Sequence, residues 1–226
     1  MTAHTTPCDS APASRVPSAD LVAQARAYLA RPDAPREQLE QYLTALIAEV
    51  ERAQHCPLTG LWTRDAWTRQ ATQMIATGGP CAVIFIDLDG FKAINDGLDH
   101  DAGDALLTAT GARLATWCER TDGLPARFGG DEFVALLPAA AVDDVATRSV
   151  LREELTTPVP HDGQQLGVGA SIGVAAVAPG PQETAPARLS AALHAADRAM
   201  YRDKALRRGG QTTDRRGRLV TSAPTR

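Results

Sequence analysis

The sequence predicts an α/β fold in which helices cover one β-sheet and a short helical extension precedes the sheet. Two observations predict this class. Beyond Pro57, segments with helical periodicity alternate with short apolar segments typical of strands, which favours helices packed over a single sheet. Before Pro57, apolar residues recur every three or four positions, as they do along an amphipathic helix. The 226 residues are long enough for one domain and an appendage.

The region before the domain divides into two parts. Residues 1–17 are rich in Thr, Ser, Ala and Pro and are expected to be disordered. Residues 18–55 are expected to form a helical extension, with helices over about 19–30 and 36–55. Apolar residues of the second helix follow a heptad spacing: Leu39, Leu43, Leu46, Val50 and Ala53. Two heptads leave two alternatives open, a helix lying on its own domain and a short dimerising stalk.

The main domain is expected to span residues 56–210. The unbroken apolar segment CAVIFI (81–86) is rich in β-branched and aromatic residues and predicts a central buried strand. Gly129 and Gly130 separate two strand segments, as the turn of a hairpin does. The other expected elements are helices over 65–77, 102–120, 143–155 and 187–206, strands over 124–128 and 132–137, and one or two strands over 166–177. Residues 211–226 are expected to form a flexible, Arg-rich tail.

Composition and charge exclude several classes of protein. The 44% hydrophobic and 22% charged residues are typical of a globular domain. The net charge of −4 gives no global basic field for nucleic acid or an anionic membrane. No apolar segment approaches the ~20 residues that span a bilayer, and the N-terminus resembles no secretory signal. The four cysteines form no CxxC pair, so neither a zinc site nor a disulfide framework is expected. The sequence therefore predicts a cytoplasmic protein with neither membrane nor nucleic acid as its partner.

Two pairs of acidic residues are the strongest signal of chemistry. Asp87 and Asp89 end the buried strand, where carboxylates are costly unless a cation or another partner compensates them. Asp131 and Glu132 follow the glycine pair of the hairpin. If the two strands are neighbours, Asp87 and Asp131 can share a Mg²⁺ ion. Carboxylates and a metal are what phosphoryl or nucleotidyl transfer requires.

Basic residues on the last helix could hold phosphates. No Walker A sequence is present, so a phosphate-binding group must lie elsewhere. Lys204 and Arg208 lie one turn apart on one face of the helix and could clamp a triphosphate. The alternative is a solvated basic end of a helix. The chain has only two lysines: Lys204 lies on this helix, and Lys92 lies in the carboxylate segment.

The order of several motifs resembles that of GGDEF-domain diguanylate cyclases. The motifs lie between residues 57 and 210, and the signature GGDEF itself occupies 129–133. The matching segments are LTGLWTR (58–64), FIDLDGFKAIND (85–96), HDAGD (100–104), ARFGGDEF (126–133), ASIGVA (170–175) and ADRAMYRDKALRRG (196–209). The chain is identified from them as a member of this family.

Membership implies a fold, a reaction and a partner. The fold is an α/β sandwich with a mainly antiparallel sheet, similar to the palm of nucleotide polymerases and adenylyl cyclases. The reaction condenses two GTP molecules into cyclic di-GMP and releases two pyrophosphates. Two subunits face each other in a homodimer, and each binds one GTP. Mg²⁺, with Mn²⁺ as an alternative, is the expected cofactor.

The resemblance also assigns roles to individual residues. Asp87, the Leu88 carbonyl and Asp131 would bind the metal, and Asp131 and Glu132 together would carry the catalytic carboxylate chemistry. The expected substrate-binding residues are Lys92, Asn95, Asp104, Lys204 and Arg208. Of these, Asn95 and Asp104 would bind guanine, and Lys204 and Arg208 would hold the phosphates. A carboxylate such as Asp104 accepts hydrogen bonds from guanine that adenine cannot donate, which favours GTP.

The chain departs from the family pattern at a few positions. The aspartate that usually precedes the entry motif is absent, since His55, Cys56 and Pro57 stand before Leu58. Thr63, Gly90 and Asp99 replace other common residues. These departures keep open an alternative, a module that binds GTP and signals without turnover. A third reading, a scaffold whose N-terminal helices or Arg-rich tail bind a partner such as nucleic acid, has less support in the sequence.

The inhibitory product site of the family is incomplete in this chain. Many relatives carry RxxD before the GG pair, where the motif binds dimeric product. Here Arg120 occupies the arginine position, but Gly123 occupies the aspartate position. Weak or absent product inhibition is therefore expected.

Overall fold

The structure, a computed structural model, describes most of the domain and part of the region before it. The described residues are 23, 26–28, 30–31, 36–98, 100–139, 144–209, 211–213 and 219–221. The expected disordered segment 1–17, most of the expected helix over 19–30, and Asp99 lie outside these residues, as does much of the expected tail.

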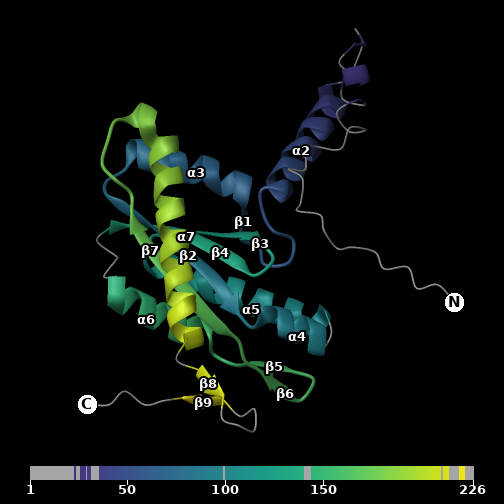
Figure 1. Ribbon diagram of the computed structural model, residues 1–226. Helices are drawn as coiled ribbons and strands as arrows, with labels where there is room; N and C mark the ends of the chain where they lie inside the picture. Colours follow the sequence, from purple (N-terminus) through teal and green to yellow (C-terminus); the bar gives the residue numbers. More distant parts are fainter. Residues whose placement is uncertain are drawn as a thin grey trace, which may run out of the picture.

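A five-stranded, mostly antiparallel sheet forms the centre of the domain, as the sequence predicts (Figure 1). Its strands are β1 (Trp62–Thr63), β2 (Cys81–Asp89), β3 (Leu124–Gly129), β4 (Glu132–Pro138) and β7 (Gly169–Ala176). Their order across the sheet is β1-β3-β4-β2-β7. β2 pairs antiparallel with both β4 and β7, and β3 pairs antiparallel with β4. β1 pairs parallel with β3. The predicted buried strand therefore lies in the interior of the sheet.

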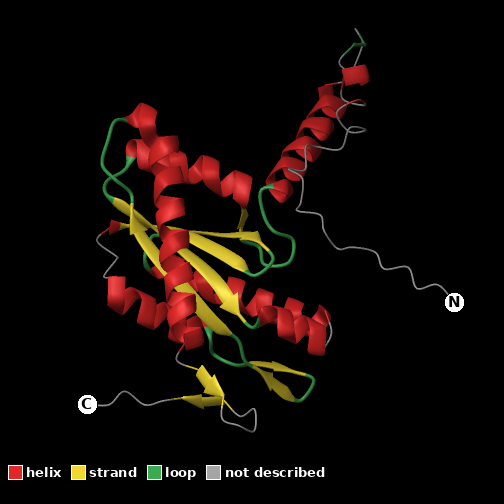
Figure 2. Ribbon diagram, in the orientation of Figure 1, coloured by secondary structure: helices red, strands yellow, loops and turns green. Residues whose placement is uncertain are grey.

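Helices cover both faces of the sheet (Figure 2). They are α3 (Arg64–Thr77), α4 (Phe91–Gly97), α5 (His100–Arg120), α6 (Asp144–Leu155) and α7 (Ala185–Gly209), with the short 3₁₀ helix η2 (Gln182–Thr184) before α7. α3 and α7 contribute to the core on one face, and α4, α5 and α6 contribute to the core on the other. The four long helices lie within a few residues of the positions that their periodicity predicts.

Both faces of β2 are buried, which explains why this strand has polar residues only at its end. Val83 and Phe85 pack in the core formed with α3 and α7, whereas Ile84 and Ile86 pack in the core formed with α5 and α6. Successive side chains of a strand point to opposite faces, so Asp87 continues the row of Val83 and Phe85. Asp87 thus belongs to the face that α7 covers.

A helix approaches the sheet closely at Gly173 of β7. A Cβ atom at this position would collide with the carbonyl oxygen of Ala196 and the amide nitrogen of Met200, both in the backbone of α7. The glycine therefore allows the helix to lie directly on the strand. This contact sets the height of the C-terminal half of α7, which carries Lys204, above the sheet.

The helix α2 (Arg36–Ala53) projects away from the domain and buries none of its residues (Figure 1). The segment after it is tied to β1, since the Thr63 hydroxyl donates to the Gln54 carbonyl (3.1 Å) and the His55 and Trp62 rings lie 4.3 Å apart. In this structure the helix does not lie on its own domain, which was one of the two alternatives. The dimerising stalk stays a prediction.

Several short elements are present that the sequence does not predict. They are β1, α4, the hairpin of β5 (Val159–His161) and β6 (Gln164–Leu166), and the ladder of β8 (Gln211–Thr213) and β9 (Leu219–Thr221). Two or three residues are too few to show a period of two, and α4 has only two turns. The β8–β9 ladder lies within the tail that was expected to be flexible.

Within the described part of the chain, no helix combines the length and the apolar character needed to cross a bilayer.

Candidate functional site

Two strand ends bring the predicted carboxylates together. Asp87 near the end of β2 lies opposite Glu132, the first residue of β4. Asp131 precedes Glu132 in the turn, and its carbonyl accepts a hydrogen bond from the Leu88 amide (3.2 Å). The expectation that the two strands are neighbours is therefore confirmed. Asp87, Asp131 and Glu132 form one acidic cluster at this end of the sheet, which we call the acidic cluster below.

Arg127 holds the turn that presents these acids. Its Nε and Nη2 atoms both donate to the Gly130 carbonyl, at 3.0 and 2.8 Å. Gly130 has a φ of +41°, a left-handed conformation that glycine adopts without strain. Arg127 Nη1 also donates to the Cys56 sulfur (3.4 Å). The turn is thereby linked to the loop that precedes β1.

Burial and mutual repulsion raise the pKa of both signature acids. For Asp131, burial is the main cause and the Asp87 carboxylate adds to it, against the lowering effect of Lys204 and Arg127. For Glu132, burial again raises the pKa, Arg64 opposes it, and the carboxylates of Asp131 and Asp87 add to it. A half-buried group of carboxylates that disfavours its own negative charge is suited to bind a cation.

Lys204 reaches the acidic cluster from α7. Its Nζ atom donates to Asp87 Oδ1 in an ion pair whose side chains are only 18% and 14% exposed. The alternative of a solvated helix end therefore does not describe Lys204. Arg208, one turn further along α7, is exposed, so its predicted role in binding phosphate stays a prediction. Lys92 on α4 is also exposed.

The residues present fit a divalent cation with oxygen ligands. Asp87 and Asp131 supply two carboxylates, and hard cations such as Mg²⁺ prefer such ligands while keeping several waters. No group of three metal-ligating side chains converges among the described residues. The predicted set needs only two side chains, because its third ligand is the backbone carbonyl of Leu88.

The predicted guanine-binding residues lie where α4 packs closely on α5. A Cβ atom at Gly103 would collide with the Asn95 amide oxygen. Asn95 is thereby placed beside Gly103 of α5, and the next residue of that helix is the exposed Asp104. The Asn95 oxygen is buried and has no hydrogen-bond partner among the described residues. A buried acceptor without a partner is costly, and a ligand donor would satisfy it.

Sequence reasoning did not single out Arg64 and Ser171. Arg64 Nη2 lies 3.6 Å from Glu132 Oε2, and its guanidinium stacks 4.5 Å from the centre of the Phe128 ring. The buried Ser171 hydroxyl donates to the Asp89 carboxylate, 2.8 Å from each oxygen. Both residues lie inside quoted motifs, LTGLWTR and ASIGVA, and that position was the available signal. Their partners are distant in sequence and could not be inferred from the pattern.

Arg120, the remaining half of the inhibitory motif, has an internal partner. Its Nη2 atom donates to both carboxylate oxygens of Glu154 on α6, at 2.6 and 2.7 Å. An aspartate at position 123 would require neighbouring side chains to shift, since its Cβ atom would collide with a Leu137 methyl group and lie 3.1 Å from the Cys118 sulfur. Both features agree with the expectation of weak product inhibition, which remains a prediction.

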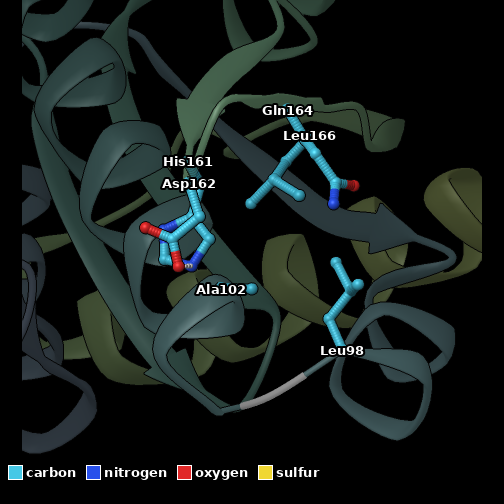
Figure 3. A pocket seen from close by; sticks show the side chains of 6 residues that line it. All are labelled: Leu98, Ala102, His161, Asp162, Gln164 and Leu166. Atoms are coloured by element: carbon cyan, nitrogen blue, oxygen red, sulfur yellow. Dashed lines mark ion pairs between the residues drawn. The ribbon is translucent and has the colours of Figure 1, made fainter.

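A cavity of about 250 Å³ lies between the β5–β6 hairpin and the start of α5 (Figure 3). Its lining residues are Leu98, Ala102, His161, Asp162, Gln164 and Leu166. None of them is a predicted site residue. Ala102 and Asp104 are two positions apart on a helix and therefore point to nearly opposite sides. The cavity is thus separate from the predicted guanine site.

Comparison with known proteins identifies the family that this chain resembles. The family model described as "Diguanylate cyclase, GGDEF domain" matches residues 36–210. An uncharacterised 19.3 kDa protein of Streptomyces ambofaciens is 44% identical over 168 residues, which cover 74% of this chain and 87% of that protein. The response regulator PleD of Caulobacter vibrioides is 39% identical over 157 residues, 66% of this chain.

A solved structure shows the same fold. The crystal structure of a sensory box/GGDEF family protein from Caulobacter crescentus aligns with a TM-score of 0.56 and 38% identity, over 68% of this chain and 99% of that one. Two other curated relatives are much longer: the chain spans 33% of PleD and 20% of an uncharacterised signalling protein of Caulobacter vibrioides. With a family match over most of its length, the chain belongs to the GGDEF diguanylate cyclase domain family.

Proposed function

We propose that the protein is a diguanylate cyclase, which condenses two GTP molecules into cyclic di-GMP with release of two pyrophosphates. The observation that carries the proposal is the acidic cluster, in which the β2–β4 register sets Asp87 opposite Glu132, beside Asp131. Lys204 adds a cation to the same point from α7. Such a combination of carboxylates and a cation suits transfer of a nucleotidyl group.

Asp87 and Asp131 would hold Mg²⁺ together with the Leu88 carbonyl. A bound Mg²⁺ supplies charge neutralisation at the phosphate oxygens and a lower pKa for an attacking hydroxyl. Asp131 and Glu132 are the groups that can accept the proton of a 3′-hydroxyl, because burial raises the pKa of each above its ordinary value and makes it a better base. Lys204 and Arg208 would hold the phosphates that become the leaving pyrophosphate.

The guanine end would be formed by Asn95 and Asp104. The unpartnered Asn95 oxygen can accept one guanine N–H, and the exposed Asp104 carboxylate can accept others. A site built on such bonds discriminates strongly against adenine, which lacks these donors. The proposed substrate is therefore GTP.

Condensation of two GTP molecules requires two acidic clusters, so we propose that the active species is a homodimer. In that species each 3′-hydroxyl attacks the α-phosphate of the opposite GTP. The reaction rate should then rise more steeply than linearly with protein concentration below the dissociation constant of the dimer.

The decisive experiment incubates the purified protein with GTP and Mg²⁺ and separates the nucleotide products by chromatography. We expect cyclic di-GMP and pyrophosphate from the wild type. In Asp131→Ala the rate of product formation should fall at least about a hundredfold, because the acidic cluster loses one carboxylate where charge develops in the transition state. Glu153→Ala, which removes an exposed carboxylate on α6, is the matched control and should retain activity.

Two results would count against the proposal. GTP binding without pyrophosphate release at any protein concentration would favour the alternative of a nucleotide-binding signalling module. Equal activity of wild type and Asp131→Ala would show that the acidic cluster is not the catalytic centre.

A further inference from the structure

The carboxylate of Asp203, next to Lys204 on α7, accepts two hydrogen bonds and forms a further ion pair. Asp203 Oδ2 accepts from Arg152 Nη2 at 2.6 Å and from the Ile172 backbone amide at 3.0 Å. Arg207, one turn further along α7, places its Nε atom 3.6 Å from the same oxygen. One carboxylate oxygen thus joins α7 to β7 and to α6.

Arg152 completes this junction from α6. While Nη2 binds Asp203, its Nε atom donates to the Ala170 carbonyl of β7 at 3.0 Å. The Arg152 side chain is 21% exposed and that of Asp203 is 16% exposed. Charged side chains buried to this degree are retained only with good partners, and a planar guanidinium that makes two directed bonds fixes orientation as well as charge.

The junction lies level with the acidic cluster. Ile172 of β7 pairs with Ile86 of β2, the residue before Asp87. Asp203 therefore binds β7 next to the point where its neighbour Lys204 binds Asp87 of β2. Two consecutive residues of α7 contact two adjacent strands, so the rotation and height of this helical turn are fixed at one place.

We propose that Asp203 and Arg152 are positioning residues, which hold Lys204 where it meets the phosphates of the nucleotide. This inference rests on the proposed function, in which Lys204 binds the triphosphate. A lysine carries a point charge on a flexible four-carbon stem, so its location depends on the placement of its helix. Ion pairs of this kind add little to stability compared with apolar packing, and a role in geometry accounts for the burial of this one.

The first test separates phosphate binding from base binding. Asp203→Asn keeps an acceptor for the Ile172 amide but loses the charge that holds Arg152. By calorimetry with Mg²⁺ present, we expect its GTP affinity to fall about tenfold or more, the effect of losing one charged hydrogen bond, while guanosine affinity stays unchanged. Arg152→Met should likewise lower the GTP affinity and leave the guanosine affinity unchanged. Arg152→Lys, which keeps the charge, should lose less GTP affinity than Arg152→Met.

Glu154, on the same helix as Arg152 (α6), provides a matched control. Glu154→Gln breaks the ion pair of similar length between α6 and Arg120 without touching α7, and it should leave both affinities unchanged. Equal losses for GTP and guanosine in Asp203→Asn would indicate a merely structural role and would overturn the inference, as would unchanged GTP affinity.

The second test observes Lys204 without any nucleotide. Because the chain has only two lysines, ¹³C-lysine labelling gives two Cε signals, which Lys92→Arg assigns. We expect Asp203→Asn to shift the Lys204 signal toward the position of the exposed Lys92, which should not move. An unmoved Lys204 signal would overturn the positioning role. If the wild type binds neither GTP nor guanosine, the proposed function fails instead, and the lysine spectrum still reports whether Asp203 places Lys204.

Discussion

At the scale of the residue, the negative charge of Asp131 lowers the stability of the fold at the proposed catalytic centre. Its pKa is raised above the ordinary value of 3.8, mainly by burial and further by the Asp87 carboxylate. The folded state therefore holds the proton more tightly than the unfolded state does. Ionisation disfavours the fold at pH values above the raised pKa, and this penalty is absent below the unfolded-state pKa. In the absence of a bound cation, the grouped carboxylates therefore make the fold less stable than uncharged side chains at the same positions would.

Asp131→Asn should therefore be more stable than the wild type at neutral pH, because the amide keeps the shape of the side chain without the charge. In metal-free buffer we expect a melting temperature about 1–3 °C higher at about pH 8, a modest gain because the group is only half-buried. The gain should shrink as the pH falls and vanish below about pH 4. Thermal melts across this range check the prediction. A variant less stable than wild type at about pH 8 would mean that Lys204 and Arg127 outweigh burial.

Arg120 is the second residue whose environment predicts behaviour. Its guanidinium is already bound by both oxygens of Glu154, and Gly123 supplies no carboxylate beside it. We expect micromolar cyclic di-GMP to change the initial rate by less than a factor of about two, because a product phosphate would have to displace an internal carboxylate. Initial rates with and without added product measure this. Inhibition that disappears in Arg120→Ala would contradict the prediction.

The sequence indicated which residues carry the chemistry better than it indicated their contacts. Asp87 and Asp131 could be singled out because a carboxylate after a buried apolar strand or a glycine pair needs a reason. The pairing of Lys204 with Asp87 could not, since 117 residues separate them and the sequence assigned Lys204 to phosphate alone. Arg64 and Arg152 were missed for the same reason, because each acts through a contact between distant segments.

At the scale of the element, the packing of α7 on β7 depends on the absence of a side chain at Gly173. Gly173→Ala would place a methyl group against the backbone carbonyl of Ala196 and the backbone amide of Met200, and backbone atoms cannot rotate away. We expect a loss of about 2 kcal/mol or more in the free energy of unfolding, or failure to fold, as in other overpacked cores. Gly167→Ala is the control, since its Cβ meets nothing within 4 Å. Urea unfolding of both variants gives the comparison, and similar midpoints would refute this account of the packing.

The elements that the sequence predicted are those with enough residues to show a period. β2 is nine residues long and buried on both faces, and α5 and α7 exceed twenty residues, so their patterns are clear. The β5–β6 hairpin has three residues in each strand, too few for alternation to appear. The register between β2 and β4 could not be predicted from the sequence either. A slip of one residue in this register would move Asp87 to the opposite face of the sheet.

At the scale of the whole molecule, α2 is the feature that the domain alone does not explain. It carries the exposed apolar residues Leu43, Ile47 and Val50, at 50%, 56% and 41% exposure, along one side of a projecting helix. Apolar residues in such a row seldom remain in water when a partner can cover them. The heptad spacing read from the sequence suits a second copy of the same helix, which would bring two domains together.

Leu43→Glu should therefore weaken the dimer, because two copies of the side chain would lose apolar contact and two charges would face each other. Each buried leucine contributes about 1.5–3 kcal/mol, so we expect the dissociation constant to rise at least about tenfold. The protein concentration that gives half-maximal specific activity should rise by a similar factor, while activity at saturating concentration is retained. Ala45→Glu, which adds the same charge two positions along and off the heptad row, should change neither quantity. Sedimentation and activity measured over the same concentrations check both, and if the two variants behave alike, α2 does not control the approach of the acidic clusters.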